Sequence, residues 1–351
     1  MPTVEWAFSP LDSQLQVWGD RWSEGVIRLV VWLSGQATFG EASEILAEVG
    51  QIHVSTSTVW REAQQWGEAL KALEQQQAER VAHLPAREEI TPGEAHTTER
   101  MGVAMDGAKM YVLGEGWKEF KVGCLFEIAE RPTFIKETLE WEVLGHAVHN
   151  TYVAHLGGPE DFGQKVWAEA YRRHWTRAWE TQVLGDGAPW IWNLADDHFY
   201  DSLRVVDWYH ATEHLGHAAE SLYGQDKSPV KQRWLNECKQ TLFEGQALRL
   251  AEALQTLAAG QTGGVRDALL EQVTYFENNQ HRMNYLELRE EGWPIGSGMV
   301  ESGAKQFKDR FTGPGMRWGR PGAERLLPIR AAVMSHTFDD AWRAIYKSPN
   351  N

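Results

Sequence analysis

The order of strand-like and helix-like segments between residues 102 and 207 constrains the fold more than any single motif. Residues 102–113 predict a strand interrupted at Asp106-Gly107, and residues 119–128 alternate apolar and polar side chains as a second strand. A candidate third strand covers 133–136, after which helical periodicity dominates 138–180. The remaining predictions are a strand over 182–186, a helix over 190–200 and a strand over 203–207.

Three strands followed by helix, strand, helix and strand is the order of a ribonuclease-H-like α/β core. From residue 210 to about residue 291 the pattern is wholly helical, which we interpret as an insertion. We therefore expect a first part of the core over 101–210, an all-helical insertion over 211–292, and a second part over 293–351. That last part carries Glu301 and a basic C-terminal segment.

The N-terminal residues 1–83 predict a separate helical module. Thr38 and Glu41 form a capping-box pattern that opens a helix, Gly50 ends it, and a second helix opens after Ser55. A helix, a short turn and a helix with Ser57 and Arg61 near its start are typical of a DNA-binding helix-turn-helix. Many helix pairs share this pattern without touching DNA. Residues 84–100 are acidic and contain proline, which indicates a linker.

Three acids fall where strands end or a helix begins. Asp106 lies on the first core strand, Asp186 ends a later strand, and Glu301 opens a helix after a Gly-Ser-Gly turn. Such positions converge at one edge of an α/β sheet, where carboxylates can share two Mg²⁺ or Mn²⁺ ions. Asp106-Gly and Asp186-Gly taken singly are more typical of turns; the combination with Glu301 favours a metal centre.

Asp207 and His210, at the end of the last predicted strand, are a further candidate pair. They could bind a metal or orient the site. They could equally form a buried hydrogen-bonded pair that fixes the junction between strand and helix, and the spacing favours this structural role.

A basic stretch follows Glu301 in a chain whose formal charge is −15. Residues 301–330 hold seven bases against three acids, so a polyanion would be focused there. The alternative is an amphipathic helix with solvated ion pairs. We expect DNA contacts from six residues, namely Lys305, Lys308, Arg310, Arg317, Trp318 and Arg320.

These motifs resemble those of DDE transposases of bacterial insertion sequences, in particular the Kra-type family of the Mutator-like group. The resemblance covers roughly residues 100–335 and rests on the segments around Asp106, Trp117, Asp186 and Asp207-Trp-Tyr-His210, on Ile-Gly-Ser-Gly-Met-Val-Glu301-Ser, and on the segments around Gly315 and Leu327. It implies that Asp106, Asp186 and Glu301 are the catalytic triad and that Asp207 and His210 are the family's Asp-x-x-His signature. Unlike many relatives, this chain has no N-terminal cysteine pairs.

The expected function is therefore metal-dependent cleavage of transposon ends and strand transfer into target DNA. The partners would be double-stranded DNA, with terminal inverted repeats and target, and further copies of the chain as a homodimer or higher oligomer. A non-catalytic, host-adopted DNA-binding protein and a stand-alone metal-dependent nuclease are the alternatives. Only Cys124 and Cys238 are present and no apolar stretch reaches membrane length, so a bacterial cytoplasmic protein, nucleoid-associated on DNA, is expected.

Overall fold

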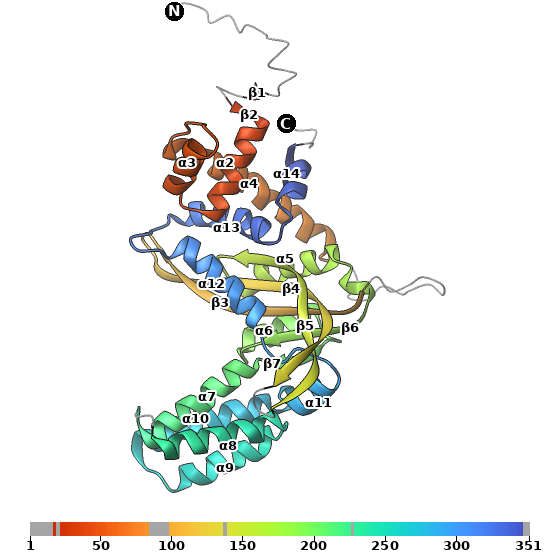
Figure 1. The fold of residues 1–351 in the computed structure, drawn as a ribbon, viewed down its shortest axis with the longest axis vertical. Coiled ribbons are helices and arrows are strands. Elements are labelled where there is room, and N and C mark those ends of the chain that lie inside the picture. The colour runs from red at the N-terminus through yellow and green to blue at the C-terminus, as the bar shows by residue number, and fades with distance from the viewer. Residues whose placement is uncertain (1–16, 19–21, 84–97, 136–138, 226–227, 347–351) are drawn as a thin grey trace, which may run out of the picture.

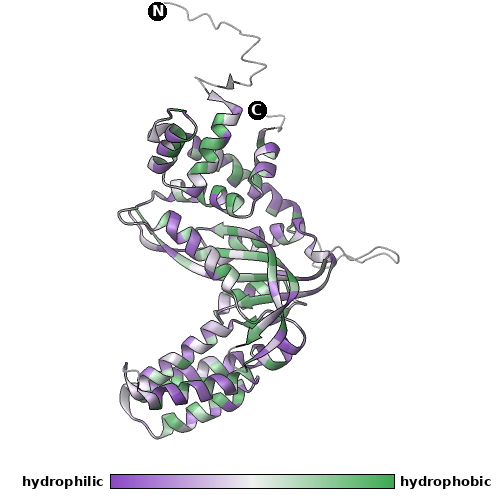
Figure 2. Cartoon of the chain, viewed as in Figure 1, coloured by the Kyte–Doolittle hydropathy of each residue, from purple (hydrophilic) through white to green (hydrophobic). Residues whose placement is uncertain are grey.

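The computed structural model describes residues 17–18, 22–83, 98–135, 139–225 and 228–346 and has a mixed α/β fold (Figure 1). Its centre is a five-stranded mixed sheet in the order β5-β4-β3-β6-β7. Figure 2 shows hydrophobic residues concentrated on these central strands. The strands are β3 (Thr98–Val112), β4 (Gly116–Ile135), β5 (Glu140–His155), β6 (Ala178–Gly185) and β7 (Leu203–Val206).

The first three strands form an antiparallel meander, whereas β6 runs parallel to β3 and β7 runs parallel to β6. The two parallel connections pass through α5 (Pro159–Arg172) and α6 (Pro189–His198). Consecutive β3 residues such as Val103, Ala104 and Met105 are all buried, because helices cover both faces of the sheet there.

The position of the third strand differs from the one expected from the sequence. Helix was expected over most of 138–180, but residues 140–155 form β5, and α5 begins only at Pro159. Leu139 adopts a left-handed φ of 61° immediately before β5, and the strand then pairs with β4 along most of its length. Cross-strand pairing with a long neighbour outweighs the local helical pattern.

The N-terminal helices are α2 (Glu24–Gln36), α3 (Phe39–Glu48) and α4 (Thr56–Val81), preceded by the short strands β1 (Val17–Trp18) and β2 (Trp22–Ser23). The capping box of Thr38 and Glu41 is present, and Ser55 caps α4. Val30, Leu46 and Val59 share a small core of their own. Helices α3 and α4 follow one another after a short connection over residues 49–55.

Two C-terminal helices join this N-terminal part to the sheet. Helix α13 (Arg320–Met334) crosses α4 where a Cβ at Gly67 would lie 2.2 Å from the Arg325 carbonyl oxygen, so only glycine permits this approach. In α14 (Phe338–Tyr346), Trp342 stacks on Trp66 with ring centroids 4.0 Å apart. Figure 1 shows α2, α3, α4 and α14 together at one end of the molecule.

At the opposite end lies a helical lobe (Figure 1) that follows β7. Its helices are α7 (Trp208–Tyr223), α8 (Pro229–Phe243), α9 (Ala247–Ala259), α10 (Gly263–Asn279) and α11 (Tyr285–Glu290). Then α12 (Gly298–Phe311) returns to the sheet and packs on β3 and β4. The expected linker lies mostly at 84–97, outside the described residues, but its end, 98–100, belongs to β3. Among the described helices, none combines the length and apolarity that crossing a bilayer requires.

Candidate metal centre at the sheet edge

The register of the parallel strands brings three acids to one level of the sheet. Ala104 of β3 pairs with Leu184 of β6, so Asp106 and Asp186 follow at the same height. Gly185 pairs with Val206 of β7, so Asp207 comes next to Asp186. Because neighbouring strands are about 4.8 Å apart, the backbones of these acids lie side by side, level with the carboxyl ends of β6 and β7. Strand β3 itself continues to Val112, so the interruption expected at Asp106-Gly107 is not present.

Asp106 is a half-buried carboxylate on β3. The Gly107 amide donates to its Oδ1 over 2.6 Å. Burial raises the pKa of Asp106; the Gly107 hydrogen bond opposes this rise, and the negative charge of Asp186 adds to it. The positive charges of His210 and Lys308 act to lower the pKa of Asp106, so groups from the turn after β6, from α7 and from α12 all act electrostatically on this carboxylate.

Asp186 stabilises the tight turn between β6 and α6. Its Oδ1 accepts a hydrogen bond from the Ala188 amide at 2.8 Å, and Gly187 has a φ of 100°, which favours glycine. Tyr275 of α10 donates its hydroxyl to the Asp186 carbonyl oxygen at 3.0 Å. The helical lobe therefore supports the turn that presents this acid.

Asp207 is fully buried and joins three parts of the chain. It caps α7, with its Oδ1 accepting from the His210 amide at 2.8 Å, and its Oδ2 accepts from the Ser297 amide. Its own amide donates to the Gly185 carbonyl at 2.8 Å. The structural role expected for Asp207 is thus present, although its partner is the backbone of His210 and not the imidazole.

Glu301 lies in the first turn of α12, where Ser297 Oγ donates to its Oε1 at 2.9 Å. One donor atom each of Asp207, His210 and Glu301 lies within 4.8 Å of the other two. Within the described residues this is the only such group of three metal-ligating side chains, and Asp106 and Asp186 are not members of it. The sharing of ions by Asp106, Asp186 and Glu301 stays a prediction.

The convergence of Asp207 and His210 with Glu301 was missed by sequence reasoning. The one sequence feature that pointed to this convergence was the Gly-Ser-Gly turn before Glu301. Its Ser297 donates its amide to Asp207 and its hydroxyl to Glu301. Carboxylate oxygens with one imidazole are a chemically suitable donor set for a divalent cation. The residues present at this edge therefore fit a metal.

Two of the six residues expected to contact DNA in the basic stretch do not face solvent, which corrects that expectation for both. Arg310 is only 4% exposed, donates Nε to the Ser34 carbonyl at 2.9 Å and lies over the Phe39 ring. Trp318 is buried and donates Nε1 to the Phe311 carbonyl at 2.8 Å. Both residues hold the N-terminal helices and α12 together, so they are unavailable to phosphates.

The other predicted contacts are accessible to different degrees. Lys305, Lys308 and Arg317 are exposed and, within the described part of the chain, form no ion pair with an acid. Arg320 is partly exposed, and its Nη2 lies 2.6 Å from Oε2 of Glu115. Ser57 and Arg61 are exposed in the first two turns of α4, so they remain candidates for DNA contact.

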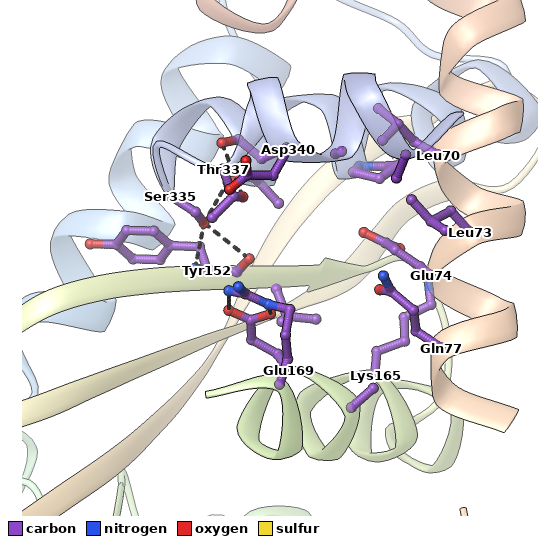
Figure 3. A pocket seen from close by; sticks show the side chains of 18 residues that line it. Leu70, Leu73, Glu74, Gln77, Tyr152, Lys165, Glu169, Ser335, Thr337 and Asp340 are labelled. Atoms are coloured by element: carbon purple, nitrogen blue, oxygen red, sulfur yellow. Dashed lines mark hydrogen bonds and ion pairs between the residues drawn. The ribbon is translucent and has the colours of Figure 1, made fainter. Parts of the chain in front are cut away.

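A separate cavity of about 310 Å³ lies between α4, α5, β5, α13 and α14 (Figure 3). Four of its charged groups form two pairs: Lys165 Nζ is 2.9 Å from Glu74 Oε2, and Arg172 Nε is 2.7 Å from Glu169 Oε2. The cavity is lined by none of the five candidate metal-site residues, which are Asp106, Asp186, Asp207, His210 and Glu301. The cavity therefore belongs to the packing of the terminal helices and adds nothing to the metal centre.

No protein-family model matches this chain, and no curated protein matches its sequence. The fold and the site together define a mixed α/β protein in which three side chains beside the carboxyl ends of β6 and β7 could hold a metal ion.

Proposed function

We propose that this chain is a metal-dependent DDE transposase with a ribonuclease-H-like core and an all-helical insertion before the catalytic glutamate. The strand order supports the core: three antiparallel strands are followed by two parallel strands reached through helices. The position of the helical lobe between β7 and α12 supports the insertion.

The observation that carries the proposal is the shared level of the acids at the sheet edge. Asp106 and Asp186 are brought together by the β3–β6 register, and α12 carries Glu301 to the same edge beside Asp207. A turn role for each acid taken singly would not require Asp106 and Asp186 to share a level of the sheet, or Glu301 to lie beside Asp207.

In this proposal Asp106, Asp186 and Glu301 hold two Mg²⁺ or Mn²⁺ ions. Bound ions of this kind activate the attacking oxygen and stabilise the leaving oxygen of a phosphodiester. Ser297 orients Glu301 through its hydroxyl, and the Gly107 and Ala188 amides orient Asp106 and Asp186. Lys308, on the same helix as Glu301, would bind a phosphate oxygen next to Asp106.

DNA would run along α12 and the loop that follows it, where Lys305, Lys308 and Arg317 are exposed. Transposon ends would be recognised through the start of α4, where Ser57 and Arg61 face solvent. A homodimer or higher oligomer would hold the two ends together.

Replacing Lys305, Lys308 and Arg317 together with glutamine is expected to weaken DNA binding. The slope of log affinity against log salt should fall by about one unit for each lost phosphate contact. Arg266→Gln is the control, because this exposed base lies in the helical lobe, outside the basic stretch, and its loss should leave the slope unchanged. Binding isotherms at several salt concentrations measure both variants, and an unchanged slope in the triple variant would show that DNA runs elsewhere.

The decisive experiment uses the full chain with DNA carrying the inverted repeats that flank its own gene. The proposal predicts cleavage at the repeat ends in Mg²⁺ or Mn²⁺ and joining of the freed 3′-hydroxyl to target DNA. Specific binding without cleavage would instead identify a non-catalytic DNA-binding protein. Cleavage without end specificity or joining would identify a nuclease.

A further inference from the structure

We propose that Asp207, His210 and Glu301 form a nitrogen-containing subsite for a first-row divalent transition-metal ion, beside the oxygen-only subsite of Asp106, Asp186 and Glu301. The inference deepens the proposed function and rests on it in part, because both subsites share Glu301. It assigns His210 a direct ligand role beyond its place in the sequence motif.

The spacing of the three donors suits one ion after a small side-chain adjustment. With metal–ligand bonds of about 2.2 Å, donor atoms around one ion lie about 3 to 4.4 Å apart. The three donors here lie within 4.8 Å of one another, before any ion draws them in. The side chains come from the α7 N-terminus and the first turn of α12, so both helices position the subsite.

Each of the three ligands has an outer hydrogen-bonding or charged neighbour. Asp207 accepts from two backbone amides, and Glu301 accepts from Ser297 Oγ. Glu213, outside the group, places its Oε2 3.6 Å from Nδ1 of His210. A carboxylate beside Nδ1 favours the tautomer that leaves Nε2 available, which is the usual arrangement of a metal-binding histidine.

The imidazole decides which ions the subsite prefers. Mg²⁺ prefers oxygen ligands and retains water, whereas imidazole nitrogen favours first-row transition ions. An excess of Mg²⁺ should therefore fill the oxygen-only subsite and leave the Asp207–His210–Glu301 subsite to Mn²⁺. Of the three histidines in α7, only His210 should affect how strongly the subsite prefers Mn²⁺ over Mg²⁺.

The test is Mn²⁺ titration of the full chain without DNA, in excess Mg²⁺, followed by electron paramagnetic resonance. Wild type should retain one Mn²⁺ per chain with a hyperfine coupling to nitrogen. His210→Ala should lose that coupling and at least about tenfold in Mn²⁺ affinity, and Glu213→Gln should weaken binding less while keeping the coupling. His217→Ala removes an exposed histidine from the same helix and should change neither.

Wild-type Mn²⁺ binding without nitrogen coupling, an absence of Mn²⁺ binding, or full affinity in His210→Ala would each overturn the subsite. Circular dichroism of each variant reports folding, and the wild-type coupling is informative even if His210→Ala does not fold. The readout involves no DNA, so it separates the two proposals. End cleavage in Mg²⁺ without nitrogen-coupled Mn²⁺ would reject the subsite alone; nitrogen-coupled Mn²⁺ without cleavage would reject the transposase alone.

Discussion

Replacing Glu301 with glutamine is expected to lower DNA cleavage and strand transfer by about 10³-fold, or about 4 kcal/mol of transition-state stabilisation. Glutamine preserves the size of the side chain and can still accept from Ser297, so α12 should fold as before. What is lost is the negative charge that would hold metal at the sheet edge. DNA binding should persist, because Lys305, Lys308 and the start of α4 are unchanged.

Cleavage of end-bearing DNA in Mg²⁺, with binding measured in parallel, tests this expectation. Asp309→Asn is the matched control, since it removes one negative charge from an exposed position on the same helix. It should cut at close to the wild-type rate. Equal cleavage by Glu301→Gln and wild type would place the catalytic centre elsewhere.

Replacing Arg310 with alanine is expected to reduce the free energy of unfolding by about 3 kcal/mol. The lost packing of a buried long side chain, a charged hydrogen bond and a cation–π contact each contribute about 1–3 kcal/mol. Relief of an unfavourable buried charge offsets part of this, because Arg310 Nη2 has no hydrogen-bond partner and Arg330 lies near. Burial lowers the pKa of Arg310 to about 10, so the guanidinium still carries its charge at neutral pH.

Urea or thermal unfolding of the full chain measures this loss. Lys305→Ala, an exposed substitution on the same helix, should change stability by less than about 0.5 kcal/mol. The effect of Arg310→Ala is expected to come from the junction of α2, α3 and α12, where its partners Ser34, Phe39 and Trp318 lie. Unfolding at the wild-type midpoint would show that this junction is not stabilised by Arg310.

Short-range signals in the sequence were sufficient for several elements. The Thr38–Glu41 capping box and the Ser55 cap set where α3 and α4 begin, because these hydrogen bonds involve residues only three apart. The ends of the strands before Asp186 and Asp207 were also predicted, because β6 ends in the apolar run Val183-Leu184-Gly185 and β7 ends in Val205-Val206. The first residues of β6, from Ala178, lie in the stretch that was expected to be helical. Strand β5 was not predicted, because its extended conformation depends on pairing with β4 and not on a local sequence pattern.

Local sequence patterns were thus enough to identify the chemical groups of the site, which are Asp106, Asp186, Asp207, His210 and Glu301. Which of these groups lie close together depends on contacts between distant segments. The β6–β7 register places Asp207 next to Asp186. The Ser297 amide, 90 residues after Asp207, donates to the Asp207 carboxylate, and this contact brings the start of α12, with Glu301, close to His210. Tertiary packing likewise buried Arg310 against a carbonyl 276 residues away, although its place in the basic stretch had favoured a DNA contact. Such contacts join distant segments, so no local pattern can encode them.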